Sequence, residues 1–371
     1  MTDNLLAQTI HAPAPAQVGT AVVKIIGLGG GGQNAINRMI ELGLDGVDFI
    51  AANTDSQALS SSLAPVRIQL GPRVTRGLGA GGDPKIGAAA AMESSRELAH
   101  ALSGADMVFV TAGMGGGTGS GAAAVAAEIA REIGAVVIAI VTMPFGFEMT
   151  RRMRNAAEGI RLLQPHTHTL ITVPNDRLLK IVPRELSLEV AFRLADDVLR
   201  QGVQGISELV TRAGLINVDF AHVRELMQRG GGALMAIGIG EGHRMAHTAI
   251  RQALRHPLLE VDSLEQASGL LVHFTGGDDL TLFDIGEAIE DLRRSFSPDI
   301  DLIFGATTEP GMSGRAQAIL IVTGIGGRAV ETAPAVEGED VSVVHTAPQA
   351  EQNLDLPAFL RRRTFLGSSG G

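Results

Sequence analysis

Glycine-rich turns that follow strand-like segments place the strongest constraint on the fold of this chain. Three such turns lie at residues 27–34, 75–84 and 113–121, and each leads into a helix-like stretch. The first and the last follow apolar, β-branched runs at 22–26 and 107–111 that predict buried strands. Glycine suits these turns because it has no Cβ, so the backbone can take positive φ or approach a ligand closely. The pattern predicts an α/β fold, with a parallel sheet and helices on both faces.

The same alternation continues through the first half of the chain, which we interpret as a Rossmann-like domain at residues 21–186. Further buried strands are predicted at 47–52, 135–142 and 169–173. The helical spacing of apolar residues predicts helices at 34–42, 84–102, 122–133 and 151–163.

A long amphipathic helix at 187–211 is predicted to connect this domain to a second one. Its apolar residues recur at helical period, Ser187 is a suitable N-cap, and Gly214 follows its end. Beyond it, strands are predicted at 233–240, 269–275, 301–306 and 317–323, with helices at 243–255 and 282–296. This pattern predicts an α+β C-terminal domain at 212–326.

Both ends of the chain have compositions typical of segments that do not pack into a core. Residues 1–20 are polar with alternating Ala and Pro, and residues 327–352 are rich in Ala, Pro, Glu, Thr and Val without helical period. We therefore predict a disordered N-terminal extension and a flexible linker. The linker leads to a docking peptide and tail at 353–371, whose apolar and basic part begins at Leu354 and ends at Arg363.

Composition excludes several classes of site. The chain has no Cys, which rules out disulfides, thiolate metal sites and cysteine nucleophiles and fits a reducing cytoplasm. Its net charge of −10 disfavours a surface built to bind nucleic acid. The N-terminal residues lack a basic region followed by an apolar stretch, so no signal peptide is predicted. The apolar run at 135–141 is far too short to span a bilayer, so direct membrane insertion is not expected.

The glycine turns predict a site for a phosphate-bearing ligand. A turn from strand to helix offers free backbone amides and the positive end of the helix dipole to an anion. The turn at 27–34 matches the fingerprint of dinucleotide sites, with Asp55 following the next strand. The turn at 113–121 has five glycines within 115–121 but lacks the lysine of a Walker loop. A nucleoside polyphosphate therefore competes with a nicotinamide dinucleotide as the ligand, and the second turn favours the polyphosphate.

The motif Gly-Gly-Gly-Thr-Gly-Ser-Gly at 115–121 resembles the signature of the tubulin and FtsZ superfamily, and the match is closer to FtsZ than to tubulin. The resemblance runs from about residue 24 to residue 323 and resumes in the tail. It includes the stretches at 53–55, 75–84, 144–148, 174–177 and 214–220. It implies a GTPase domain, a long central helix and a C-terminal domain. It further implies a self-assembling cytoskeletal protein of bacterial cell division that hydrolyses GTP to GDP and phosphate.

The resemblance also implies which residues contact GTP or GDP. The phosphates would be held by Gly30, Gly31, Gly32, Gln33, Asn34, Gly117, Thr118 and Gly119. Glu148 and Arg152 would lie at the ribose and phosphates, and Phe192 would pack on the base. Asn175 and Asp196 would recognise guanine, since a carboxylate can accept from both its N1–H and its exocyclic amine. Mg²⁺ would bind through phosphate oxygens and water.

A second set of implied residues follows the end of the long helix. Asn217, Asp219 and His222 lie in the loop that would complete hydrolysis, and the family pattern has an acid where this chain has His222. A helix from 196 to 211 spans on the order of 24 Å, so Asp219 cannot reach a nucleotide held at Asp196 in the same chain. It can serve the nucleotide of a neighbour in a head-to-tail filament. The histidine predicts retained GTP binding and assembly with slower hydrolysis.

Two alternatives remain open at this point. One is a GTP-binding structural filament protein with little hydrolysis because of His222, and the other is a nicotinamide-dependent oxidoreductase.

The predicted partners are other copies of this chain and, through the segment from Leu354 to Arg363, membrane-tethering and other division proteins. We expect a cytoplasmic protein at the division site, on the inner face of the membrane, with no nucleic-acid partner.

Overall fold

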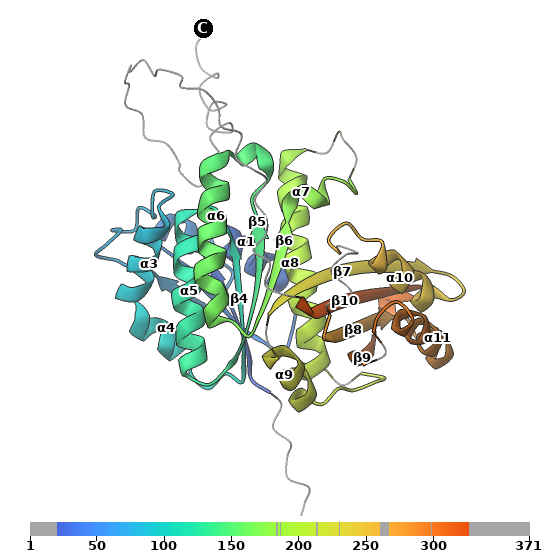
Figure 1. The fold of residues 1–371 in the computed structure, drawn as a ribbon. Helices are drawn as coiled ribbons and strands as arrows, with labels where there is room; N and C mark the ends of the chain where they lie inside the picture. The colour runs from blue at the N-terminus through green and yellow to red at the C-terminus, as the bar shows by residue number, and fades with distance from the viewer. Residues whose placement is uncertain are drawn as a thin grey trace, which may run out of the picture.

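One continuous sheet organises the molecule. The computed structural model describes residues 21–325, apart from 183, 184, 186, 213, 230, 260–266 and 298. Within this part the sheet has ten strands in the order β3-β2-β1-β4-β5-β6-β7-β10-β8-β9. Figure 1 shows the sheet passing from the first unit to the second alongside α8. The predicted N-terminal extension, linker and docking peptide lie outside the described residues.

The first unit is a parallel sheet covered by helices on both faces, as predicted. Its strands are β1 (Val23–Leu28), β2 (Asp48–Asn53), β3 (Val66–Gln69), β4 (Met107–Gly113), β5 (Val136–Met143) and β6 (Thr169–Pro174). Its helices are α1 (Gly29–Glu41), α2 (Ser56–Ser60), α3 (Pro84–Glu93), α4 (Ser95–Leu102), α5 (Gly117–Glu132), α6 (Thr150–Leu163) and α7 (Asn175–Leu178). The central strands β4 and β5 are buried, apart from Gly113 at the end of β4, because helices cover both of their faces.

Two hydrophobic cores lie on the two faces of this sheet. Ile25 and Ile138 belong to the core shared with α1, α8 and α9, and Ile26 and Val137 belong to the core shared with α3 to α6. Successive strand residues point to opposite faces, so each strand contributes to both cores. The sheet is therefore packed on both faces, between the two cores.

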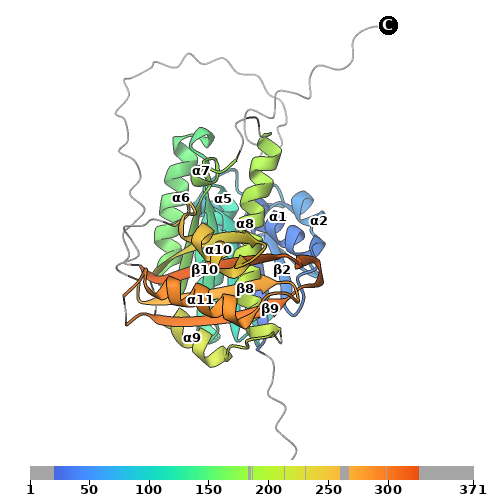
Figure 2. The same ribbon diagram turned by 90° about the vertical axis from the view of Figure 1, so that its right-hand side faces the viewer.

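The second unit continues the sheet in a mixed order. Its strands are β7 (Gly232–Glu241), β8 (Gly269–Gly276), β9 (Asp301–Thr308) and β10 (Arg315–Ile325), and its helices are α9 (Phe220–Gln228), α10 (Met245–Leu254) and α11 (Leu282–Arg293). β10 pairs antiparallel with β7 and β8, and β8 pairs parallel with β9. β7 joins β6 in parallel through Leu170–Gly232 and Ile171–Ala233. Figure 2 brings α10 and α11 to the front, over the strands of this unit.

The helix α8 (Leu188–Thr211) connects the two units, and its predicted N-cap is confirmed. Ser187 Oγ accepts a hydrogen bond from Val190 N, and the apolar face of the helix is buried. A Cβ at Gly202 would lie 2.7 Å from Met235 Sδ, and one at Gly205 would lie 2.8 Å from Ile319 Cδ1. These glycines let α8 contact the sheet of the second unit closely.

Two local expectations differ from the structure. The predicted helix at 84–102 is two helices divided at Ser94, whose Oγ accepts from Gly71 N and donates to Gln69 O at the end of β3. The predicted helix at 243–255 begins only at Met245, because Arg244 adopts the left-handed conformation with φ 59°.

Candidate functional site

The amino termini of α1 and α5 lie side by side at the ends of β1 and β4, which are neighbouring strands. A Cβ at Gly29, where φ is +68°, would lie 2.9 Å from Gly119 N and 3.2 Å from Thr118 Cβ. A Cβ at Gly31 would lie 3.1 Å from Gly113 Cα. Only glycine permits this close approach, which brings the free amides of two helices and two dipoles to one place. Such a paired terminus is suited to a polyphosphate.

The predicted phosphate glycines divide into two groups. A Cβ at Gly30 would meet nothing within 4 Å, so this position faces open space. At Gly32 a Cβ would lie 2.5 Å from Thr111 O, and at Gly119 it would lie 2.6 Å from Gly113 O. Gly117 is similarly enclosed, at 2.8 Å from Ala80 Cβ. These three glycines are required by packing, whatever they contact in a ligand.

The polar side chains at these termini have different roles. Gln33 is buried, and its Nε2 donates to Ala58 O at 2.6 Å, so its side-chain amide contacts α2. Asn34 is exposed. Thr118 Oγ1 and Thr54 Oγ1 are 2.6 Å apart. Sequence reasoning did not select Thr54, although its place at the end of β2, beside the other glycine turns, was a usable signal.

Glu148 and Arg152 form a pair next to the Gly115 turn. Glu148 is buried, its Oε1 accepts from Phe145 N at 2.9 Å, and its Oε2 lies 3.0 Å from Arg152 Nε. A Cβ at Gly115 would lie 2.9 Å from Arg152 O, so the start of α6 packs against the turn before α5. Asn155 Nδ2 also donates to Gly115 O at 3.3 Å and to Gly82 O at 3.0 Å. Asn155 therefore ties together two of the glycine turns, a role that the sequence alone did not indicate.

Aromatic contacts connect this region to the start of α8. Phe145 stacks on Phe147 at 5.0 Å between ring centroids and meets Phe192 edge-on at 5.4 Å. Gly146 N donates to Asp176 Oδ1 at 2.9 Å, which ties the start of α7 to the same turn. The segment preceding α6 therefore contacts both α7 and α8.

Two polar side chains in this region, one buried and one partly buried, are suited to a ligand. Asn175 is buried at the first position of α7, and its Oδ1 has no hydrogen-bond partner among the described residues. Burial, and to a lesser degree the charge of Asp197, raise the pKa of Asp196 to about 7. Buried polar groups in native proteins normally have partners, so an orphaned acceptor here points to a bound donor.

The aspartate that would hold a dinucleotide ribose has another function. Asp55 Oδ1 accepts from Gln57 N at 2.8 Å and from Ala58 N at 3.0 Å, and so caps α2. In a nicotinamide site, an acid at this place would bond the ribose hydroxyls instead. The geometry therefore gives the nicotinamide alternative no support at this residue.

The predicted hydrolytic residues lie at the opposite end of α8 from Asp196. Asn217 Oδ1 accepts from Gly214 N at 2.7 Å, and Asp219 Oδ1 accepts from Ala221 N at 2.9 Å to cap α9. His222 is exposed in the first turn of α9. Figure 1 shows α7 at one end of α8 and α9 at the other. The structure therefore does not bring these three residues to the paired helix termini of the same chain.

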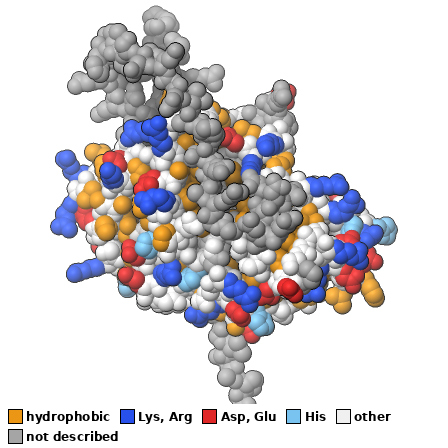
Figure 3. All heavy atoms as spheres, in the orientation of Figure 1, with side chains coloured by type: hydrophobic (Ala, Val, Ile, Leu, Met, Phe, Trp, Pro, Cys, Tyr) orange, Lys and Arg blue, Asp and Glu red, His pale blue; other side chains and the backbone are white. Residues whose placement is uncertain are grey.

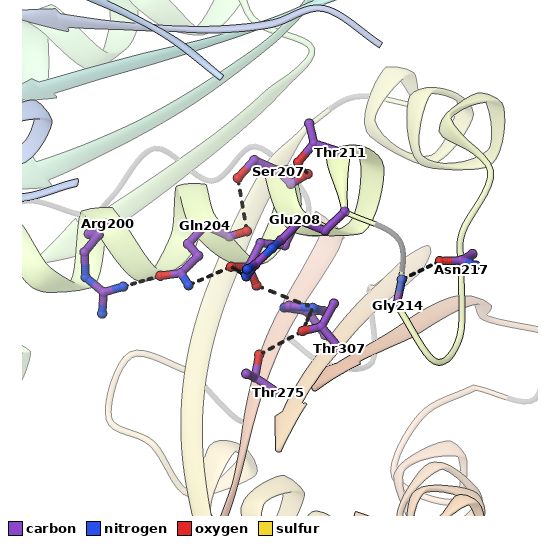
Figure 4. A network of polar contacts seen from close by, with 11 residues as sticks. Arg200, Gln204, Ser207, Glu208, Thr211, Gly214, Asn217, Thr275 and Thr307 are labelled. Carbon is purple, nitrogen blue, oxygen red and sulfur yellow. Dashed lines mark hydrogen bonds and ion pairs between the residues drawn. The ribbon is translucent and has the colours of Figure 1, made fainter. Parts of the chain in front are cut away.

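A separate polar cavity of about 220 Å³ lies between α8 and the second unit, with Gln204, Glu208, His273 and Gln317 in its wall. Glu208 and His273 are both buried, and Glu208 Oε2 and His273 Nδ1 lack hydrogen-bond partners within the described chain. Figure 4 shows this network from Arg200 to Thr307. It lies away from the paired helix termini and stands apart from the candidate nucleotide site.

No group of three or more His, Cys, Asp or Glu in the described residues could hold a metal ion. Mg²⁺ bound through phosphate oxygens therefore stays a prediction, and the paired helix termini would place those phosphates.

None of the helices described is long and apolar enough to cross a bilayer. On the face seen in Figure 3, basic and acidic side chains are intermingled.

Comparisons with known proteins were consistent with this geometry. Residues 22–183 match the GTPase domain of the tubulin/FtsZ family, and residues 231–326 match the C-terminal domain of the FtsZ family. An FtsZ dimer from M. jannaschii is 43% identical, with a TM-score of 0.80 over 83% of this chain and 90% of that one. A mutant of FtsZ from the same organism gives the same identity and score over 82% and 92%. CetZ2 from Haloferax volcanii is 23% identical, with a TM-score of 0.68 over 82% and 94%, and shares the fold.

Proposed function

The chain belongs to the FtsZ family, and from this premise we propose that it binds and hydrolyses GTP and polymerises head to tail into filaments of the bacterial division ring. The observation that carries the proposal is the pairing of the α1 and α5 termini, where Gly29 faces Thr118 and Gly119. Polyphosphate binding follows from the free amides gathered there.

The nucleotide lies from the paired termini toward the start of α8 in this proposal. The phosphates contact the turns that begin α1 and α5, with Mg²⁺ held by phosphate oxygens and water. Glu148 and Arg152 contact the ribose and phosphates. Asn175 and Asp196 bind the guanine edge, and the orphaned Asn175 Oδ1 supports this assignment. Phe192, already edge-on to Phe145, packs beside the base.

Hydrolysis requires a second subunit. The γ-phosphate of the nucleotide bound to the adjacent subunit would contact Asn217, Asp219 and His222. These residues are separated from the nucleotide of their own chain by the length of α8. Two solved relatives support self-association: the FtsZ structure from M. jannaschii is a dimer, and the CetZ2 structure is a GTPgS-bound protofilament. A heterologous contact of this kind does not close on itself, so it generates a filament.

A mixing experiment tests the shared site. Asp219→Ala removes the hydrolytic acid and keeps nucleotide binding, whereas Asp196→Ala weakens nucleotide binding and keeps the loop. Neither variant alone should hydrolyse GTP efficiently. In a mixture, the intact loop of the second variant meets the nucleotide of the first, so hydrolysis should return. No activity in the mixture, with both variants folded by circular dichroism, would contradict a site shared between subunits.

The remaining alternative within the family is a filament protein that hydrolyses GTP slowly. His222 stands where the family pattern has an acid, so we propose assembly with reduced turnover.

The tail from Leu354 to Arg363 would recruit membrane-tethering and other division proteins, which would place the filament at the division site on the inner face of the membrane. Deleting residues 353–371 should leave assembly intact and abolish recruitment.

A further inference from the structure

An apolar hollow on the exposed face of α11 has no role in the proposed function. Leu282 is 71% exposed and Phe283 is 89% exposed, at the first turn of the helix. Together with Gly286, Glu287 and Glu290 they line a hollow of about 210 Å³. Figure 3 shows hydrophobic and acidic surfaces side by side over α11. An exposed pair of this size, next to charge, is characteristic of an interaction site.

Gly286 gives this hollow its shape. It lies in the middle of α11 on the exposed face, and a Cβ there would meet nothing within 4 Å. Its φ is not positive, so neither backbone conformation nor a neighbour among the described residues demands glycine. Glycine lowers helix propensity relative to alanine. An unexplained glycine beside an exposed phenylalanine leaves a notch that an incoming side chain can fill.

The charges around the hollow define the partner. Glu290 is exposed one turn beyond Gly286 and has no ion-pair partner in the described chain, and Glu287 pairs with Arg244 at 3.0 Å with both side chains exposed. Asp278 adds an exposed acid in the loop before α11. A complementary partner is therefore short, apolar and basic.

This chain carries a segment of that chemistry. Residues 354–363 read LDLPAFLRRR, with Phe359 and three leucines for the hollow and three arginines for the acids. Leu354 lies 29 residues beyond Ile325, where β10 ends. A flexible tether of that length spans about 30 Å on average, and β10 itself is about 37 Å long. The hollow lies near the amino-terminal end of β10, whereas the tail leaves from its carboxyl-terminal end. The segment at 354–363 can reach the hollow across this distance.

We propose that the hollow on α11 docks the tail of the same chain, with Phe359 in the notch beside Gly286 and the arginines against Glu290 and Glu287. A tether of this length holds the segment at an effective concentration of about a millimolar, so even a weak contact is populated. The docked tail would be withheld from other partners. This interaction lies outside the nucleotide site, so its failure would leave the proposed GTPase function unaffected.

Energy transfer within the full-length chain tests the proposal. The sequence has no cysteine, so Arg293→Cys on α11 and Ser368→Cys in the tail can carry a donor and an acceptor. Dilute, nucleotide-free protein should show high transfer, which falls on adding excess synthetic peptide 353–371. Phe283→Asp and Gly286→Leu should each lower transfer to the value of a free tether. Met92→Asp, at an exposed methionine on α3, is the matched control and should change nothing.

A charge exchange separates docking from a general change in the tether. Glu290→Lys should lower transfer, and adding Arg362→Glu should restore at least part of it. Transfer that is insensitive to Phe283→Asp would overturn the proposal. Transfer that appears only as protein concentration rises would instead make a second copy the occupant, which also overturns it. If only an external protein occupied the hollow, energy transfer in the wild-type chain would equal that of a free tether. That result would also overturn the proposal.

Discussion

Asp196 combines a partly buried position with a proposed role that requires its charge. An ionised carboxylate can accept both guanine donors, yet burial raises the pKa of Asp196 to about 7 in the nucleotide-free protein. As pH falls through 7, the free carboxyl takes up a proton that must leave on binding. Affinity for GTP should therefore decrease, by about tenfold or more between pH 8 and pH 5.5.

Asp196→Asn separates this effect from the titration of the phosphates. The amide cannot ionise, so the variant should bind GTP weakly with a flatter pH profile. Both proteins share the phosphate titration, so the difference between their profiles reports the carboxyl group. Binding of a fluorescent GTP analogue at low protein concentration provides the measurement. Parallel profiles would show that Asp196 does not contact the base.

His222 lies in the proposed hydrolytic loop, at the position where the resemblance implies an acid. It is exposed, and its backbone N donates to Asp219 O at 3.0 Å, so a change of side chain should preserve α9. His222→Asp restores the second acid. We expect similar GTP affinity and assembly, with hydrolysis per subunit raised by up to about tenfold.

Turnover measured beside the parent distinguishes a catalytic His222 from a passive one. A rate per subunit that is the same in His222→Asp and in the parent would assign the site to Asp219 and Asn217 alone.

At the scale of elements, α8 contacts the second unit through a buried polar pair. His273 Nε2 lies 3.1 Å from Thr307 Oγ1 and 3.8 Å from Glu208 Oε2, while Glu208 Oε1 is 3.0 Å from Arg212. Figure 4 shows Glu208 on α8 facing Thr307 and Thr275 of the strands. Burial, and then the charge of Arg212, lower the pKa of His273 to about 4. The histidine is therefore neutral in the folded protein at neutral pH.

This lowered pKa predicts a loss of stability in acid. Unfolded chains bind a proton at this histidine near pH 6.5, whereas the folded protein binds it only near 4, so stability falls as pH decreases between these values. From pH 7.5 to pH 5 the loss should be about 2 kcal/mol. His273→Asn should show a pH dependence smaller by that amount in urea unfolding. His100→Asn, at an exposed histidine, is the control and should behave as the parent.

The same elements show what the sequence could and could not predict. Local patterns located α8 and its Ser187 cap, the glycine turns and the strands of both units except β3, because periodicity and capping are local properties. The pairing of Glu208 with His273 depends on residues from distant elements. The hydrogen bond that His168 Nδ1 accepts from Val137 N at 2.9 Å likewise joins residues far apart in the chain. The site residues before α8 could be selected by motif, whereas the convergence of Asn155 on two turns could not.

At the scale of the whole molecule, the separation of the two proposed functional ends should determine the kinetics of hydrolysis. The helix termini that would hold phosphate and the Asp219 loop lie at opposite ends of α8 (Figure 1). A monomer therefore has only half of the proposed hydrolytic site facing its nucleotide. Activity must depend on how many subunits have a neighbour.

Hydrolysis per subunit should rise with protein concentration, together with light scattering that reports filaments. At low concentration the rate should be close to background, because no loop faces the nucleotide. Asp219→Ala should keep GTP affinity and lower hydrolysis by about 100-fold or more, the usual effect of losing a positioned acid or base. Glu225→Ala, an exposed acid on α9 outside the loop, should behave as the parent. A rate per subunit that stays constant down to dilute monomer would mean that one chain carries the complete site, and Asp219 would then have no partner nucleotide to serve.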